Sequence, residues 1–235
     1  MKAFILTALC ALTLVACKGN QNRQTPEPAP GPAETTEVQE TVIPVPVPAD
    51  STGIAFECYK QIMARFDEPV DGECPEGVTL SYLDSMDDIE GYMSNGTYSC
   101  FPLVGGGWLC VYEHVEAAEG TPGFYNYASY TYKDGELADV EVLPVPALEE
   151  LFDEASVDPG NKELVPKLKA NFKERPRDFL TYWIDPFEQT VIPQLRPVDL
   201  ESEEASGNWL EAYWEYRKDG DRLPVYHWNG KEFVK

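Results

Sequence analysis

The aromatic residues of this 235-residue chain are confined to one part of it. All five Trp, all 13 Tyr and nine of the ten Phe lie in residues 53–235. Residues 18–52, which come before them, contain seven Pro and no aromatic residue. Such a segment buries too little apolar surface to offset the entropy lost when it orders. We therefore expect a disordered Pro-rich linker, residues 17–52, followed by a single globular domain, residues 53–235.

The periodicity of apolar residues within 53–235 indicates short helices and aromatic-rich strands. Helical spacing, or a helix-capping residue, marks four segments: 54–66, a short helix capped by Ser85, 146–155 and 161–174. Alternation of aromatic and β-branched residues marks five strands: 108–116, 124–132, 179–184, 209–217 and 223–228. These elements predict an α+β fold, with a mostly antiparallel, aromatic-rich sheet and a few short helices on a disordered N-terminal stalk.

Two dipeptides in the domain are typical of tight hairpin turns. Asp134-Gly135 and Asn229-Gly230 each follow a pair of aromatic residues and precede an apolar one. Both dipeptides suit a type I′ turn, in which the two central residues have positive φ. The two segments resemble each other, and either duplication of a β-unit or convergent hairpin chemistry explains the resemblance.

The first residues of the chain have the pattern of an export signal. Lys2 supplies a positive charge, and residues 3–16 are uncharged and mostly apolar. This is the charged region and apolar region of a secretory signal peptide. The apolar stretch is shorter than the roughly 20 residues that a membrane-spanning helix needs. We therefore expect an exported protein.

A cysteine closes this signal. Leu14-Val15-Ala16-Cys17 resembles the lipobox of bacterial lipoproteins. The resemblance implies that the signal peptide, residues 1–16, is removed and that Cys17 carries diacylglycerol and a further acyl chain such as palmitate. Two or more acyl chains anchor a protein stably to a membrane, and one does not. Lys18, rather than Asp, follows the cysteine. The resemblance to lipoproteins then implies the outer membrane of the cell envelope, in either leaflet. The alternative is an ordinary secretory signal with a chance cysteine.

Four cysteines remain in the domain: Cys58, Cys74, Cys100 and Cys110. An even number in an exported chain favours disulfide bonds. We favour the pairs Cys58–Cys74 and Cys100–Cys110, because the second pair flanks a glycine turn at 105–107 that would place its members opposite each other. The chain has no CxxC motif, so we expect no zinc site.

Motifs that would carry catalysis or hold a cofactor are missing from the sequence. It has no G-x-S-x-G elbow, no H-E-x-x-H motif and no P-loop. The two histidines, His114 and His227, lie in strand-like segments, and a thiol dyad of Cys110 and His114 would require an unpaired Cys110. The acidic clusters at 67–73 and 84–90 do not match an EF-hand loop. We therefore expect no metal and no cofactor.

The chain is strongly acidic, with a formal net charge of −23. Residues 53–158 hold 22 acidic and 3 basic residues, whereas residues 159–235 hold 14 and 12. A surface of this sign repels nucleic acids and anionic lipid and attracts cations or basic proteins. The charge therefore argues against a nucleic-acid partner.

The expected envelope location, the acidic charge and the composition together favour a non-enzymatic binding or structural module of the cell envelope. Its partner would be a basic protein or a glycan, and exposed aromatic side chains such as Trp209 and Tyr213 would form the binding face. The alternative is an envelope hydrolase that uses two carboxylates as general acid and base, since the partners of such a pair need not be close in sequence.

The lipobox generates a direct test. Cys17→Ala removes the sulfur that lipidation requires, so the variant should move from the membrane fraction to the soluble fraction. Labelling of wild-type cells with radioactive palmitate should mark the protein, and the variant should stay unlabelled. A variant that remains in salt-washed membranes, together with an unlabelled wild type, would contradict lipidation.

Overall fold

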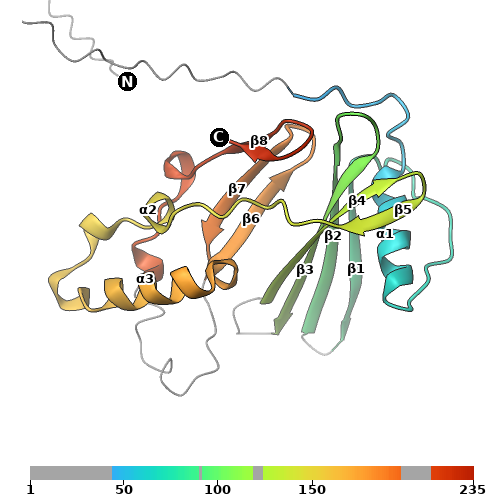
Figure 1. Ribbon diagram of the computed structural model, residues 1–235. Coiled ribbons are helices and arrows are strands. Elements are labelled where there is room, and N and C mark those ends of the chain that lie inside the picture. Colours follow the sequence, from blue (N-terminus) through green and yellow to red (C-terminus); the bar gives the residue numbers. More distant parts are fainter. Residues whose placement is uncertain (1–43, 90–91, 119–123, 197–212) are drawn as a thin grey trace, which may run out of the picture. The chain divides into compact units, whose positions relative to one another are not determined.

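The computed structural model describes residues 44–89, 92–118, 124–196 and 213–235. It has the predicted α+β fold, with two antiparallel sheets and a few short helices (Figure 1). The described residues form one compact unit. The predicted signal peptide, Cys17 and Trp209 lie outside the described residues. None of the helices in the described ranges has the length and apolar character needed to cross a membrane.

The first sheet is a meander of five antiparallel strands in chain order. Its strands are β1 (Ser81–Ile89), β2 (Tyr92–Pro102), β3 (Trp108–Ala118), β4 (Phe124–Lys133) and β5 (Glu136–Asp139). The strands predicted at 108–116 and 124–132 are confirmed as β3 and β4. Alternation along these strands gives the sheet two faces, and each face is covered by different elements.

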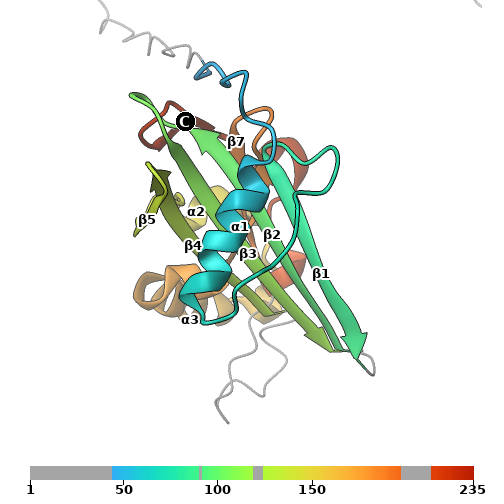
Figure 2. The same cartoon turned by 90° about the vertical axis from the view of Figure 1, so that its right-hand side faces the viewer.

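Helix α1 (Ile54–Arg65) covers one face of this sheet, as Figure 2 shows. Glu57 in its first turn and Arg65 in its last complement the helix dipole. We call the contact between helix and sheet the α1 core. Its buried members are Ala55, Phe56, Cys58, Tyr59, Ile62, Met63, Tyr98, Cys100, Cys110 and Tyr130. The helix predicted at 54–66 is therefore confirmed.

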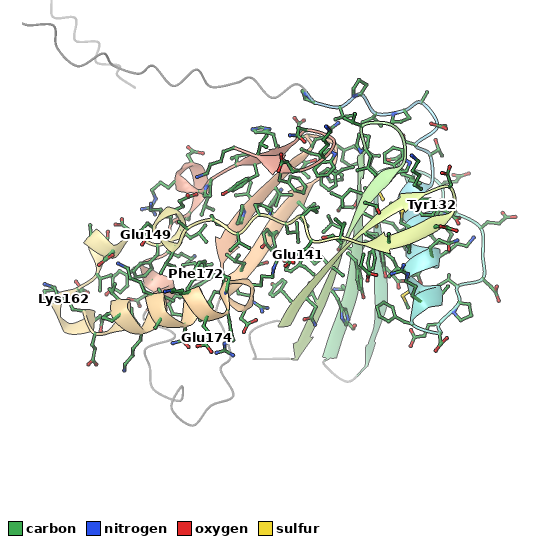
Figure 3. The ribbon with its side chains drawn as sticks, viewed as in Figure 1. Tyr132, Glu141, Glu149, Lys162, Phe172 and Glu174 are labelled. Atoms are coloured by element: carbon green, nitrogen blue, oxygen red, sulfur yellow. The ribbon has the colours of Figure 1, made fainter. Side chains whose placement is uncertain are left out.

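The opposite face of β2 and β3 belongs to a second and larger core. Phe101, Leu109 and Val111 of those strands are fully buried there. They join residues of the second sheet and of two helices, including Phe172, which is 7% exposed and is labelled in Figure 3. Trp228 of the second sheet donates its indole N–H to the carbonyl oxygen of Pro102 at 2.6 Å. This bond ties the second sheet to the end of β2.

The elements that complete the larger core come from the C-terminal half of the chain. The second sheet is a four-stranded antiparallel meander, β6 (Leu180–Asp185), β7 (Thr190–Leu195), β8 (Tyr226–Trp228) and β9 (Phe233–Val234). The helices are α2 (Leu148–Leu151) and α3 (Leu164–Glu174), with short 3₁₀ turns at Glu154–Ser156, Pro159–Asn161, Pro176–Phe179 and Gly220–Arg222. Pro166 lies in the first turn of α3, where its missing N–H costs no helical hydrogen bond.

Two sequence predictions of secondary structure were wrong. Ser85 was expected to cap a helix, but it lies in β1, where pairing with β2 satisfies the backbone. Residues 209–217 were expected to form a strand, but 213–215 are helical and 209–212 lie outside the described residues. Tyr213 and Tyr216 are both buried. Their spacing of three residues fits one turn of helix, and a short aromatic window does not distinguish that period from alternation.

The three glycines at 105–107 form the turn between β2 and β3, with φ of 91°, 92° and 91°. The turn brings Cys100 directly opposite Cys110, as predicted. Asp134 and Gly135 both have positive φ between β4 and β5, as a type I′ turn requires. Asn229 instead opens a wider turn, in which its side-chain oxygen accepts the N–H groups of Lys231 and Glu232. The two similar sequences therefore form different turns.

The start of the described chain is bound to the second sheet. Val45 donates its N–H to Gln189 Oε1 at 3.0 Å, and Gln189 Nε2 donates to the carbonyl oxygen of Val45 at 2.6 Å. Gln189 is buried in the β6–β7 turn with φ of 54°. The two hydrogen bonds help to offset the strain of that backbone conformation, which a glycine would adopt freely.

The glycine turn offers a matched pair of substitutions. Gly107→Ala should destabilise the domain more than Gly105→Ala, although both residues have the same φ. A Cβ at Gly107 would lie 2.8 Å from the carbonyl oxygen of Tyr132, whereas one at Gly105 meets nothing within 4 Å. We expect both variants to lose about 1–3 kcal/mol from backbone strain, with a further loss at Gly107. Chemical denaturation measures both, and equal losses would contradict the contact.

Candidate functional site

Three of the four domain cysteines meet in the α1 core. Cys58 comes from α1, Cys100 from β2 and Cys110 from β3, and their Sγ atoms all lie within 4.8 Å of one another. Each of the three side chains has 0% exposure. Cys74 is exposed, in the loop between α1 and β1. No sequence motif brings these three together; the convergence depends on how α1 docks on the sheet.

The strand pairing explains why the side chains of Cys100 and Cys110 approach each other. Cys100 donates its N–H to the carbonyl oxygen of Leu80 at 2.8 Å. Its peptide groups therefore point away from β3, which makes Cys100 and Cys110 a non-hydrogen-bonded pair, the kind with the closer side chains. Their Cα separation in such a pair, about 4.5 Å, is within the range of disulfides.

All four domain cysteines are thiols in this structure. The pairs Cys58–Cys74 and Cys100–Cys110 stay predictions. The position of Cys58 matters for the predicted pair Cys58–Cys74. Its sulfur lies beside those of Cys100 and Cys110, whereas Cys74 is at the surface.

The three buried thiols differ in their readiness to lose a proton. Burial raises the pKa of Cys100 well above its ordinary value. Hydrogen bonds from Cys100 and then Cys110 lower the pKa of Cys58, although burial and the charge of Glu57 act in the opposite direction. Cys58 is therefore the first of the three to become a thiolate. Reactive cysteines are partly exposed, so full burial does not favour a catalytic nucleophile here.

The thiol dyad of Cys110 and His114 is not supported by the geometry. The two residues share a face of β3, but they are four residues apart, which is about 13 Å along a strand. His114 Nε2 instead lies 2.9 Å from the hydroxyl oxygen of Ser94, and its ring stacks on Tyr112. His227 is a strand residue of β8, opposite Thr190 and Val234.

A second polar site centres on the hydroxyl group of Tyr127 in β4. It donates to Glu113 Oε1 at 2.7 Å and accepts the N–H of Tyr182 at 3.1 Å. Thr181 Oγ1 lies 2.7 Å from the same oxygen. Because the single hydroxyl proton of Tyr127 goes to Glu113, Thr181 is the donor in this last bond. The phenol thereby joins β3 and β4 to β6.

The exposed edge of β6 explains why Tyr182 turns its N–H to Tyr127. Tyr182 pairs with Pro193 of β7, and proline has no N–H to donate. The N–H of Tyr182 therefore points away from β7, at the edge of the second sheet. An unpaired edge amide is a liability, and the Tyr127 hydroxyl satisfies it. This arrangement is structural rather than catalytic.

Burial raises the pKa of Glu113, and the hydrogen bond from Tyr127 partly opposes that shift. No carboxylate of another described residue contributes to it. The paired carboxylates that the hydrolase alternative requires are therefore not found at this half-buried residue.

The predicted binding face at Trp209 and Tyr213 depended on exposure of those rings. Tyr213 has 0% exposure, and its hydroxyl donates to the carbonyl oxygen of Arg196 in the larger core. Trp209 lies outside the described residues. Tyr213 is thus a core residue, and this structure does not present it to a partner.

Other aromatic side chains are exposed instead. Trp183 of β6 is 65% exposed, and Phe187 in the β6–β7 turn is 62% exposed. Phe66 at the end of α1 is 55% exposed. The signal for Trp183 was present in the sequence, since buried Tyr182 and half-buried Ile184 flank it in a predicted strand and alternation turns it outward.

Comparisons of the chain with models of protein families, with curated proteins and with solved structures found no match.

The raised pKa of Glu113 predicts how Glu113→Gln changes stability with pH. A carboxyl whose pKa is raised by folding is harder to ionise in the folded state, so the wild type loses stability as pH rises from the unfolded pKa, about 4.3, through the folded one. Glutamine does not titrate, and it keeps an oxygen that accepts from Tyr127. The variant should therefore gain stability relative to the wild type across that interval.

Urea denaturation at a series of pH values measures this difference. Glu136→Gln, at an exposed residue of β5, is the control for the loss of one surface carboxylate. A difference for Glu113→Gln that does not vary with pH would show that burial does not affect the ionisation of Glu113.

Proposed function

We propose that this chain is a lipid-anchored lipoprotein of the cell envelope whose domain is a non-enzymatic binding module. The lipobox at Leu14–Cys17 supports the proposed lipid anchor and envelope location. The pair of exposed aromatic rings on one hairpin, Trp183 and Phe187, supports binding and carries the proposal. We call these two side chains the hairpin aromatics.

The hairpin aromatics have the properties of an interface anchor. Trp is among the residue types that contribute most to binding free energy at protein interfaces. Asp185 Oδ1 accepts the N–H groups of Phe187 and Glu188 at 2.9 and 3.0 Å, which fixes the turn that carries Phe187. A rigid turn loses little conformational entropy when a partner binds.

A protein partner fits this surface better than a glycan. Sugar recognition needs polar groups placed around the aromatic ring. Asp185, the carboxylate closest to Trp183 in sequence, already uses its Oδ1 to accept two backbone N–H groups of the turn. The hairpin, residues 180–195, carries Asp185 and Glu188 and no Lys or Arg, which adds a preference for positive charge. The partner proposed is therefore a protein with an apolar patch bordered by Lys and Arg.

The double variant Trp183→Ala/Phe187→Ala tests this function. A partner is first identified by cross-linking in envelopes and then purified, and its Kd is measured with the full chain in detergent. Truncation of a hot-spot residue costs about 2 kcal/mol, or about 30-fold in Kd, so binding by the double variant should weaken at least that much. Association should also slow as salt rises.

Phe66→Ala is the matched control, since it removes an exposed aromatic ring far from the hairpin in sequence. It should bind like the wild type. Equal binding by the double variant and the wild type would reject the hairpin aromatics as the interface. If a purified envelope glycan, and no protein, bound through them, the proposed class of partner would be wrong.

A further inference from the structure

We propose that Cys58, Cys100 and Cys110 form a buried site that binds one trivalent thiophilic metalloid ion, of which arsenite is the probe, through three sulfur ligands. The proposal concerns the reduced chain. It does not depend on the proposed binding function, because the cysteines lie in the α1 core and the hairpin aromatics lie on the second sheet.

The first argument is the type and spacing of the ligands. Thiolate sulfur selects soft ions over hard ones. A sulfur–metal distance of about 2.3 Å places ligand sulfurs about 4 Å apart, and the three Sγ atoms already lie within 4.8 Å of one another. Small side-chain rotations therefore suffice to bring all three onto one ion.

The second argument is the number of ligands. Among the described residues, the His, Cys, Asp and Glu ligand atoms that converge here are these three sulfurs. Zinc in structural sites takes four ligands, and in catalytic sites it takes three and a water. Full burial of all three side chains leaves solvent no direct approach. A trivalent ion such as As(III), which has a lone pair on its open side, is satisfied by three sulfurs in a pyramid.

The third argument is charge. Three thiolates carry a charge of −3. The basic residues beside the α1 core, Lys60 and Arg65, lie over its Phe56 and Tyr130 rings with their side chains partly exposed, so neither is a buried counter-charge. Glu57, whose charge acts on Cys58, is itself paired with Lys60 at 3.7 Å, so it does not offset the charge of the thiolates. A monovalent ion would leave two negative charges in this core, and a divalent ion would leave one. A trivalent ion leaves none, and uncompensated buried charge is costly.

Binding balances without an oxidant or a reductant. Arsenous acid, As(OH)₃, reacts with three thiols: three As–S bonds form and three As–O bonds break. Each thiol proton leaves with one hydroxide as water, so three waters are released. Arsenic stays trivalent, and the product is neutral.

The test uses two samples of the full chain in detergent. One has no added reductant, and the other has been treated with a phosphine reductant. Native mass spectrometry after addition of arsenite should show one arsenic gained and three hydrogens lost. The wild type should keep the arsenic in the presence of a competing small dithiol, and the melting temperature should rise, since ligands that bind the folded state stabilise it.

Cys58→Ser should lose the arsenic to the competing dithiol, because only two sulfurs remain. Cys74→Ser is the matched control and should keep it, since Cys74 lies at the surface. Circular dichroism melting shows whether each variant folds, and Cys58→Ala serves if Cys58→Ser does not. Retention of arsenic by a folded Cys58 variant would overturn the three-sulfur site.

Two further outcomes would also overturn the proposal. Alkylation of the denatured, unreduced protein counts the thiols of the chain as it exists. If no thiol in 53–235 is labelled, the predicted disulfides hold and the site does not exist in the native protein. If Zn²⁺ or Cu⁺ displaces arsenic at equal concentration, the charge argument fails.

Discussion

Burial of β2 and β3 on both faces is the constraint on which the rest of the structure depends. Cys100 and Cys110 point to α1, while Phe101, Leu109 and Val111 point to the larger core, and all five are 0% exposed. Both cores therefore share one pair of strands as a common wall. The backbone of the wall is satisfied by pairing with β1 and β4, so its side chains need supply no polar groups. This explains how adjacent residues such as Cys100 and Phe101 serve different cores.

Because the shared strands β2 and β3 contribute apolar side chains, the polar contacts between the two sheets lie elsewhere. The second sheet meets the first through specific hydrogen bonds: the Tyr127 hydroxyl at the edge of β6, and the Trp228 indole on the carbonyl oxygen of Pro102. Each bond satisfies a group that would otherwise lie buried without a partner, which would cost about 1–3 kcal/mol. These hydrogen bonds fix the position of one sheet against the other. Apolar packing alone would leave that position undefined, because apolar contacts are not directional.

Much of the fold was predictable from the sequence, and the cysteine cluster was not. Alternation located β3 and β4, and the glycine turn at 105–107 placed Cys100 opposite Cys110, because both signals are local. Ser85 misled because a capping residue and a strand residue look alike until the pairing partner is known. Tyr213 misled because a three-residue spacing fits a helical turn as well as a strand. Cys58 joins Cys100 and Cys110 only through the docking of α1, a long-range packing event that no local pattern encodes.

The hydrogen bonds between Val45 and Gln189 have a mechanical consequence. If Cys17 is held in a membrane, a force on the domain is transmitted through the linker to Val45. The hydrogen bonds between Val45 and Gln189 transmit that force to the β6–β7 hairpin. Trp183 and Phe187 belong to the same hairpin. A partner bound to Trp183 and Phe187 would pull on the same hairpin to which the N-terminal linker is hydrogen-bonded. Tension between partner and membrane would therefore run through this one hairpin.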